Sequence, residues 1–127
     1  MSNHADDDAK TTVLIVSDDA TAAALLGGLV ETFGYRVVFA RLVTTNDAIK
    51  RSRPRVCMLD CDGDACNEAA IARVIMRGVS VVLVGPRSLL DGMREIAARH
   101  GAEMVFTPPE PGPLREALAR AVRRASV

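Results

Sequence analysis

Three short and unbroken apolar runs constrain the fold of this chain more than any other feature of its sequence. They are Val13–Val16, Val56–Leu59 and Val81–Val84. Strands of a parallel sheet are covered on both faces, so they read as continuous Val/Ile/Leu runs and not as an alternation of apolar and polar residues. The sequence therefore predicts a parallel β-sheet with helices on both of its faces.

Strand-like and helix-like patterns alternate along the rest of the 127 residues. We expect strands at about residues 13–17, 35–40, 56–60, 79–84 and 103–107. We expect helices at about residues 21–33, 44–51, 69–75, 88–100 and from Pro113 onward. This order is typical of an α/β fold, here (βα)₅ with a doubly wound, parallel, five-stranded sheet. The chain length suits a single domain, which we place at residues 11–125 after a disordered leader at residues 1–10.

Local signals predict several details of the helices and turns. The first helix carries an apolar stripe made of Leu25, Leu26, Leu29, Val30 and Phe33. Ser88 has capping-box spacing with Asp91 and is expected to open the fourth helix. The residues Asp62-Gly63-Asp64 are expected to form a turn, and the proline-rich segment 108–112 to be non-helical. The last helix is expected to hold a solvated arginine face, formed by Arg115, Arg120, Arg123 and Arg124.

Composition argues against several classes of partner. The chain has 16 Lys and Arg residues and 16 Asp and Glu residues, and this balance gives no support to nonspecific nucleic-acid binding. No apolar stretch approaches the roughly 20 residues that span a bilayer, and the polar N-terminus is unlike a signal peptide. We therefore expect a cytoplasmic protein that binds neither nucleic acid nor membrane.

The three cysteines are Cys57, Cys61 and Cys66. Their spacing matches neither a CxxC motif nor a set of zinc ligands. Cys57 falls inside a predicted buried strand, where a free thiol behaves as a small hydrophobe. We therefore expect neither a disulfide nor a metal site among them.

Carboxylates follow two of the three apolar runs. Asp18 and Asp19 come after the first run and Asp60 after the second. Ligands of open parallel sheets bind beyond the carboxyl ends of the strands, so these side chains converge if the two strands are neighbours. Gathered carboxylates need a cation, and oxygen ligands suit Mg²⁺. Taken singly, each aspartate is more often a cap or turn residue, and Asp19 could cap the first helix. The three together favour a cation site.

With these acids in place, the chain resembles the receiver domain of two-component response regulators over about residues 11–125. The matching stretches are Val13–Asp19, Phe33–Tyr35, Arg53–Asp60 and His100–Ala102. The resemblance implies a flavodoxin-like receiver fold. It also implies that Asp60 accepts a phosphoryl group from a histidine kinase or phosphotransfer protein. Asp18 and Asp19 would hold Mg²⁺ together with Asp60, and the backbone carbonyl of Asp62 would complete the metal shell.

The sequence departs from the receiver pattern at two switch positions. Gly85 stands where a Ser or Thr normally binds the phosphoryl group, and Thr107 stands where a Lys pairs with it. The chain's two lysines, Lys10 and Lys50, lie elsewhere, and Arg87 is the candidate replacement for the missing cation. Met104 also replaces the usual aromatic residue of the last strand. We therefore expect an atypical, stand-alone receiver that is not an enzyme.

Two other functions remain open. The first is a phosphorylation-independent interaction module, favoured by the two lost switch positions. The second is a phosphatase of the haloacid-dehalogenase type, with Asp60 as nucleophile and Asp62 as acid/base. After Asp64, however, the chain holds one aspartate, Asp91, and no lysine to complete such a site.

The resemblance also implies a downstream protein partner. It would bind the face made by the fourth helix, the fifth strand and the last helix, and a homodimer is compatible with this arrangement. We expect that face to include Met93, Arg94, Met104 and Arg115.

Overall fold

A computed structural model describes residues 10–63 and 66–125 of the chain. Its centre is a five-stranded sheet with strand order β2-β1-β3-β4-β5, in which every neighbouring pair is parallel. The strands are β1 Thr12–Val16, β2 Arg36–Ala40, β3 Val56–Asp60, β4 Ser80–Pro86 and β5 Glu103–Thr107. The predicted doubly wound α/β fold is confirmed, and the bounds of β3 and β5 are those expected from the sequence.

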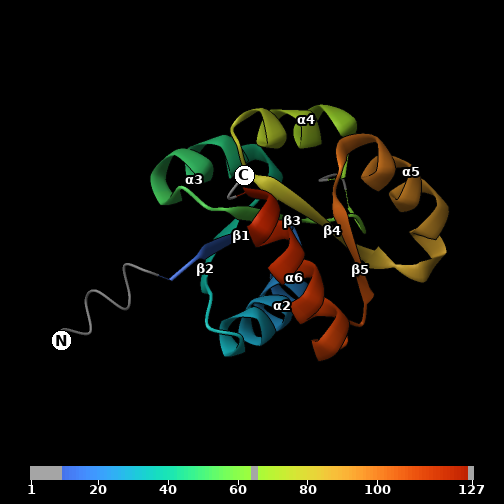
Figure 1. The fold of residues 1–127 in the computed structure, drawn as a ribbon, viewed down its shortest axis with the longest axis horizontal. Helices are drawn as coiled ribbons and strands as arrows, with labels where there is room; N and C mark the ends of the chain where they lie inside the picture. Colours follow the sequence, from blue (N-terminus) through green and yellow to red (C-terminus); the bar gives the residue numbers. More distant parts are fainter. Residues whose placement is uncertain (1–9, 64–65, 126–127) are drawn as a thin grey trace.

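Helices cover both faces of the sheet (Figure 1). One face carries α2 (Ala20–Thr32) and α6 (Pro111–Ala125). The other carries α3 (Thr45–Ser52), α4 (Glu68–Met76) and α5 (Leu90–His100). Two short 3₁₀ turns, η1 (Leu42–Thr44) and η2 (Arg87–Leu89), lead into α3 and α5.

The apolar runs supply both layers of the core. In β1, Leu14 and Val16 face one cluster, while Val13 and Ile15 face the other. This division follows from the two-residue period of a strand, because successive side chains point to opposite faces. Fully burying each such side chain contributes roughly 1.5–3 kcal/mol. The runs are unbroken because both faces of the sheet are buried.

Cys57 is the second residue of β3 and is fully buried as a free thiol. Burial raises the pKa of this thiol to about 12, because the thiolate would lose its hydration. The interpretation of Cys57 as a small hydrophobe is confirmed.

Three local predictions about the helices are wrong. Leu25 is 73% exposed, because the inward face of α2 is formed by Ala23, Leu26 and Val30. Ser88 does not cap a helix: it lies inside η2, and α5 follows Leu89 without a side-chain cap. The helix α6 begins at Pro111, within the segment predicted to be non-helical. Proline is tolerated there because the first N–H groups of a helix have no intrahelical acceptor.

The arginines of α6 do more than form a solvated face. Arg120 and Arg124 both pair with the Glu103 carboxylate, at 2.8 and 2.9 Å, and the Glu103 side chain is only 10% exposed. A buried carboxylate needs such partners to offset its lost hydration. The Arg115 guanidinium lies 4.7 Å from the centre of the Phe33 ring. These contacts fasten α6 to β5 and to the end of α2.

Two predicted features fall partly outside the described residues. Apart from Lys10, the predicted leader lies outside the described residues, as does Asp64 of the predicted turn.

Within residues 10–63 and 66–125, no helix is both long enough and apolar enough to cross a membrane.

A pair of adjacent glycines in α2 tests the packing of this helix on β2. A Cβ at Gly28 would meet nothing within 4 Å, whereas a Cβ at Gly27 would lie 2.5 Å from the Phe39 ring. Replacing helical Gly by Ala normally stabilises by about 0.5–1 kcal/mol. We expect Gly28→Ala to show this gain in urea denaturation. We expect Gly27→Ala to show less of it, because the Phe39 ring must move. Equal gains would contradict the close contact.

Candidate functional site

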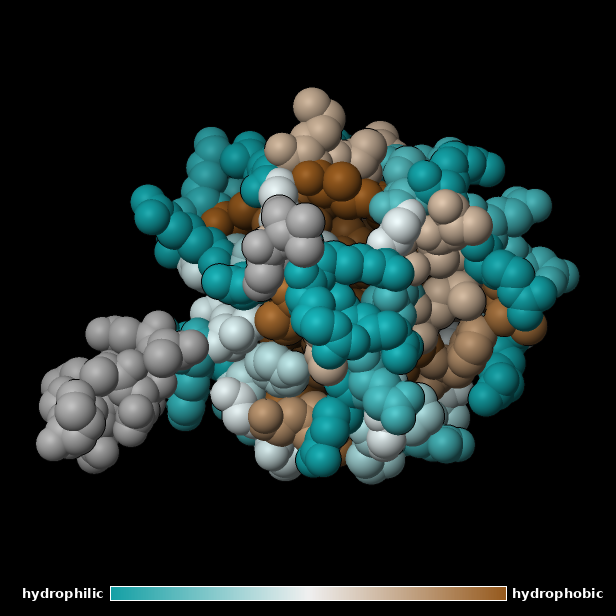
Figure 2. Space-filling view, in the orientation of Figure 1, coloured by the Kyte–Doolittle hydropathy of each residue, from teal (hydrophilic) through white to brown (hydrophobic). Residues whose placement is uncertain are grey.

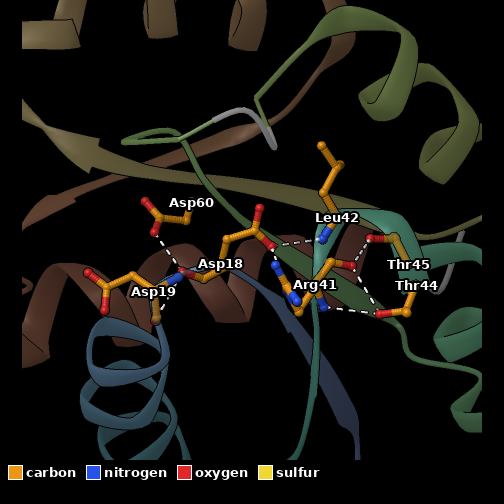
Figure 3. Close-up of polar contacts among 8 residues, drawn as sticks. Asp18, Asp19, Arg41, Leu42, Thr44, Thr45 and Asp60 are labelled. Carbon is orange, nitrogen blue, oxygen red and sulfur yellow. Dashed lines mark hydrogen bonds and ion pairs between the residues drawn. The ribbon is translucent and has the colours of Figure 1, made fainter.

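The three predicted acids lie at the same edge of the sheet (Figure 3). Asp60 is the last residue of β3, and Asp18 and Asp19 follow directly after β1. These strands are neighbours, with Val16 opposite Leu59, so their carboxyl ends meet. The topology therefore brings the three residues close together. It does not determine which groups their side chains contact.

Asp60 is half-buried and accepts a hydrogen bond at each carboxylate oxygen. The Ser17 hydroxyl donates to Oδ2 at 2.7 Å, and the Asp62 N–H donates to Oδ1 at 3.0 Å. Ser17 is itself buried and also accepts a hydrogen bond from the Asp19 N–H at 3.1 Å. One hydroxyl therefore links the end of β1 to the carboxylate at the end of β3.

Asp18 and Asp19 are exposed, and each has a partner other than Asp60. Asp19 is the N-cap of α2, and its Oδ1 accepts from the Ala22 N–H at 3.1 Å. Asp18 Oδ1 accepts from Arg41 Nε and from the Leu42 N–H, both at 3.4 Å. Figure 3 shows the Asp18 carboxylate directed toward these two donors. The cap role that the sequence allowed for Asp19 is the one observed.

These contacts bear directly on whether the residues fit a magnesium ion. Among residues 10–63 and 66–125, no three His, Cys, Asp or Glu side chains are placed to hold a metal together. The oxygen donors suit Mg²⁺ in kind. The Arg41 and Asp18 side chains are 73% and 51% exposed, and an exposed ion pair contributes only about 0–1 kcal/mol. The oxygens are thus of the kind that Mg²⁺ binds but are not gathered for it in this structure, and turning Asp18 from Arg41 toward a cation would cost little.

The first predicted switch position is tightly packed. Gly85 is buried in β4, and a Cβ there would lie 3.0 Å from Met93 Sδ and 3.2 Å from Cys61 Cβ. A Ser or Thr there would therefore require Met93 or Cys61 to shift by a few tenths of an ångström. Sequence reasoning identified the missing hydroxyl but not this cause.

The second predicted switch position, Thr107, is exposed at the end of β5. Arg87, the proposed substitute for the missing lysine, has its guanidinium 4.8 Å from the centre of the Phe106 ring. This is the distance of a cation–π contact. Arg87 is therefore held next to β5 by an aromatic ring, and its predicted contact with a phosphoryl group stays a prediction.

Two cysteines next to the candidate phosphoacceptor overturn another expectation. Cys61 and Cys66 form a disulfide, with their Cα atoms 4.7 Å apart. That separation lies within the range that a disulfide can bridge. The prediction that no disulfide would form is wrong, because it used only the motif spacing. It ignored that the chain turns back between the end of β3 and the start of α4.

A cavity of about 680 Å³ borders the site. Ser17 and Asp60 line it, together with Leu25 and Leu29 of α2 and with Thr107 and Pro108 after β5. A second hollow of about 440 Å³ lies beside Phe39 and Arg41 and shares Ser17 with the first. The Asp60 carboxylate thus opens onto a recess with largely apolar walls. The exposed Leu25, which the sequence assigned to the core, is one of those walls.

The predicted output surface needs one correction. Met93 is 2% exposed, so it belongs to the core and cannot contact a partner. Its side chain points inward, where it packs near Gly85. Arg94 and Arg115 are exposed and Met104 is half-buried. In Figure 2, hydrophilic side chains alternate with small apolar areas over the visible face.

Comparison with known proteins identifies the fold. No protein-family model and no curated protein sequence matches this chain. The N-terminal signal receiver domain of a two-component response regulator from Bacteroides fragilis superposes with a TM-score of 0.79 at 18% identity, covering 90% of this chain and 98% of that one. The receiver domain of NtrX from Brucella abortus gives 0.76 at 20% identity, covering 87% and 98%.

A third solved structure is more similar in sequence. It is a Burkholderia pseudomallei protein that its description relates to pilus assembly, with a TM-score of 0.75 at 27% identity and 90% coverage of both chains. Strand order, helix placement and these superpositions agree. The chain therefore has the fold of a response-regulator receiver domain.

Proposed function

We propose that this chain is a cytoplasmic receiver module of two-component signalling, with Asp60 as its phosphoacceptor. The observation that carries the proposal is the place of Asp60 at the end of the central strand β3. There its carboxylate is half-buried, hydrogen-bonded at both oxygens and open to the 680 Å³ cavity. A phosphohistidine on a kinase or phosphotransfer protein is the donor class that such a carboxylate serves in this fold.

The transfer is a displacement at phosphorus. An Asp60 oxygen forms the new P–O bond while the P–N bond to the donor imidazole breaks, and the imidazole keeps the electron pair and takes a proton. Ser17 and the Asp62 N–H orient the carboxylate. Asp18, Asp19, Asp60 and the Asp62 carbonyl would hold Mg²⁺, which when bound offsets the charge of the phosphoryl group. Turning Asp18 away from Arg41 prepares the site.

Phosphorylation of Asp60 is the first test. The protein is incubated with Mg²⁺ and acetyl phosphate, and its intact mass is measured. We expect one added phosphoryl group in the wild type and none in Asp60→Asn, because the amide is not a nucleophile for phosphorus. Asp62→Asn is the matched control: it removes a neighbouring carboxylate and keeps the backbone carbonyl, so it should still be phosphorylated.

Each remaining outcome of this test points to another function. A phosphoryl group added to the Asp60→Asn variant would show that the acceptor is another residue. Steady release of inorganic phosphate that depends on both Asp60 and Asp62 would indicate the phosphatase chemistry. No adduct in the wild type would contradict the proposal and support the interaction module.

The interaction module is the second candidate because of the packing at Gly85. A Cβ at Gly85 would lie 3.0 Å from Met93 Sδ and 3.2 Å from Cys61 Cβ, so a switch side chain would be crowded there. The Burkholderia structure, at 27% identity, is related by its description to pilus assembly and not to a response regulator. Under this second hypothesis the receiver fold presents a surface to a partner protein, and binding of that partner does not depend on phosphorylation.

The closed position at Gly85 generates a second prediction. Overpacking a buried site typically costs about 1–3 kcal/mol, so Gly85→Thr should destabilise the fold by that amount. Adding Met93→Ala should recover part of the loss, because the sulfur that blocks the new side chain is gone. Urea denaturation of both single variants and the double variant measures the coupling. Gly63→Ala, where a Cβ meets nothing within 4 Å, is the control.

Additive effects of Gly85→Thr and Met93→Ala would contradict the direct contact between these positions.

A downstream protein, or a second copy of the chain, would bind the face made by α5, β5 and α6. Arg94, Met104 and Arg115 are the residues that we propose for that contact.

A further inference from the structure

We propose that Cys61 and Cys66 form a reversible thiol–disulfide pair, and that its oxidation state sets the geometry of the segment that holds Asp62 against Asp60. The site would exchange with low-molecular-weight thiols of the glutathione class. The pair and its effect on local geometry do not depend on the function of Asp60. The consequence for magnesium binding and phosphorylation rests on the proposed function of Asp60.

The disulfide joins two fixed points on either side of the candidate site. Cys61 follows Asp60 directly, at the end of β3. Cys66 precedes Asn67, the N-cap of α4, whose side chain accepts from the Ala70 N–H at 2.8 Å. The bond therefore ties the end of a central strand to the start of the next helix, and Asp62 lies within the covalent loop.

The two sulfurs differ in their surroundings. Cys61 is 8% exposed, its N–H donates to the Val84 carbonyl at 2.6 Å, and its Cβ packs where Gly85 leaves room. Cys66 is only half-buried. An external thiolate therefore reaches the Cys66 sulfur more easily, and Cys61 is the natural leaving group.

The exchange balances without any further reactant. A glutathione thiolate attacks Cys66 Sγ, the S–S bond breaks, and its electron pair goes to Cys61 Sγ, which takes a proton. A second glutathione thiolate attacks the mixed disulfide, releases Cys66 as a thiolate and forms glutathione disulfide. The protein disulfide gains two electrons and two glutathione molecules lose them. Glutathione disulfide drives the reverse reaction.

The coupling to Asp60 runs through one hydrogen bond. The Asp62 N–H donates to Asp60 Oδ1 at 3.0 Å, and Asp62 is exposed, so few other contacts hold it there. A short covalent loop restricts the conformations of the residues it encloses. Opening the disulfide removes this restriction. The Asp62 amide and carbonyl then keep their places beside Asp60 for a smaller fraction of the time.

Cys57 provides an internal control for the test. It is free, fully buried, and burial raises the pKa of its thiol to about 12. Alkylation of the native protein at neutral pH should therefore spare Cys57, since the thiolate is the reactive form. Labelling of the folded protein reports the Cys61 and Cys66 pair alone.

The test equilibrates the wild-type protein in buffers of varied glutathione to glutathione disulfide ratio. After alkylation of the native protein, intact mass should show two added groups at reducing ratios and none at oxidising ratios, with one reversible transition. Cys57→Ser should titrate like the wild type, and Cys66→Ser should show no transition. Absence of the disulfide at every ratio would overturn the proposal.

Amide NMR spectra of the two redox states test the effect on the site. We expect the amide signals of Asp60, Asp62 and Asn67 to shift on reduction, while that of Ala121 in α6 stays in place. Unchanged signals at Asp62 and Asp60 would overturn the proposed coupling. A Mg²⁺ titration of the same signals should show at least a threefold weaker affinity after reduction. No response to Mg²⁺ in either state would contradict the function of Asp60 and leave the redox pair supported.

Discussion

Burial of the central strands on both faces is the constraint on which the rest of this structure depends. The side chains of β1, β3 and β4 fill two separate core clusters, one under each layer of helices. These strands are all parallel, so the chain must cross back to the first edge of the sheet between one strand and the next. Here each of those connections contains a helix. The consequence is that all carboxyl ends of the strands meet at one edge. The polar residues that end the apolar runs are brought together by this topology and not by any local sequence signal.

At that edge the same side chains serve structural and chemical needs. Asp19 satisfies a free N–H group at the start of α2, and Asp18 sits against Arg41 and the entry to η1. Both are ordinary uses of an aspartate after a strand. Binding of a cation would have to draw on the same oxygens, so metal affinity and the local order of α2 and η1 are linked. Ser17 belongs to this network because it contacts both Asp60 and the Asp19 backbone.

The fold could be predicted from the sequence because its unbroken apolar runs mark the buried central strands. The bounds of β3 and β5 and the order of the elements follow from such runs and from the glycines and prolines between them. The failures share another cause. Whether Leu25 faces the core, whether Met93 is exposed and whether Cys61 meets Cys66 depend on contacts between distant elements, or on how a turn folds back. The Ser17 hydroxyl was overlooked for the same reason, since its partner lies 43 residues away.

The packing around Gly85 has a consequence for substitutions at this position. A hydroxyl-bearing residue can enter this position only if Met93 or Cys61 shifts by a few tenths of an ångström. Residues 85 and 93 therefore constrain each other, and a side chain at position 85 fits better with a smaller residue at position 93. Such a coupling makes the absence of a side chain at position 85 harder to reverse by a single substitution.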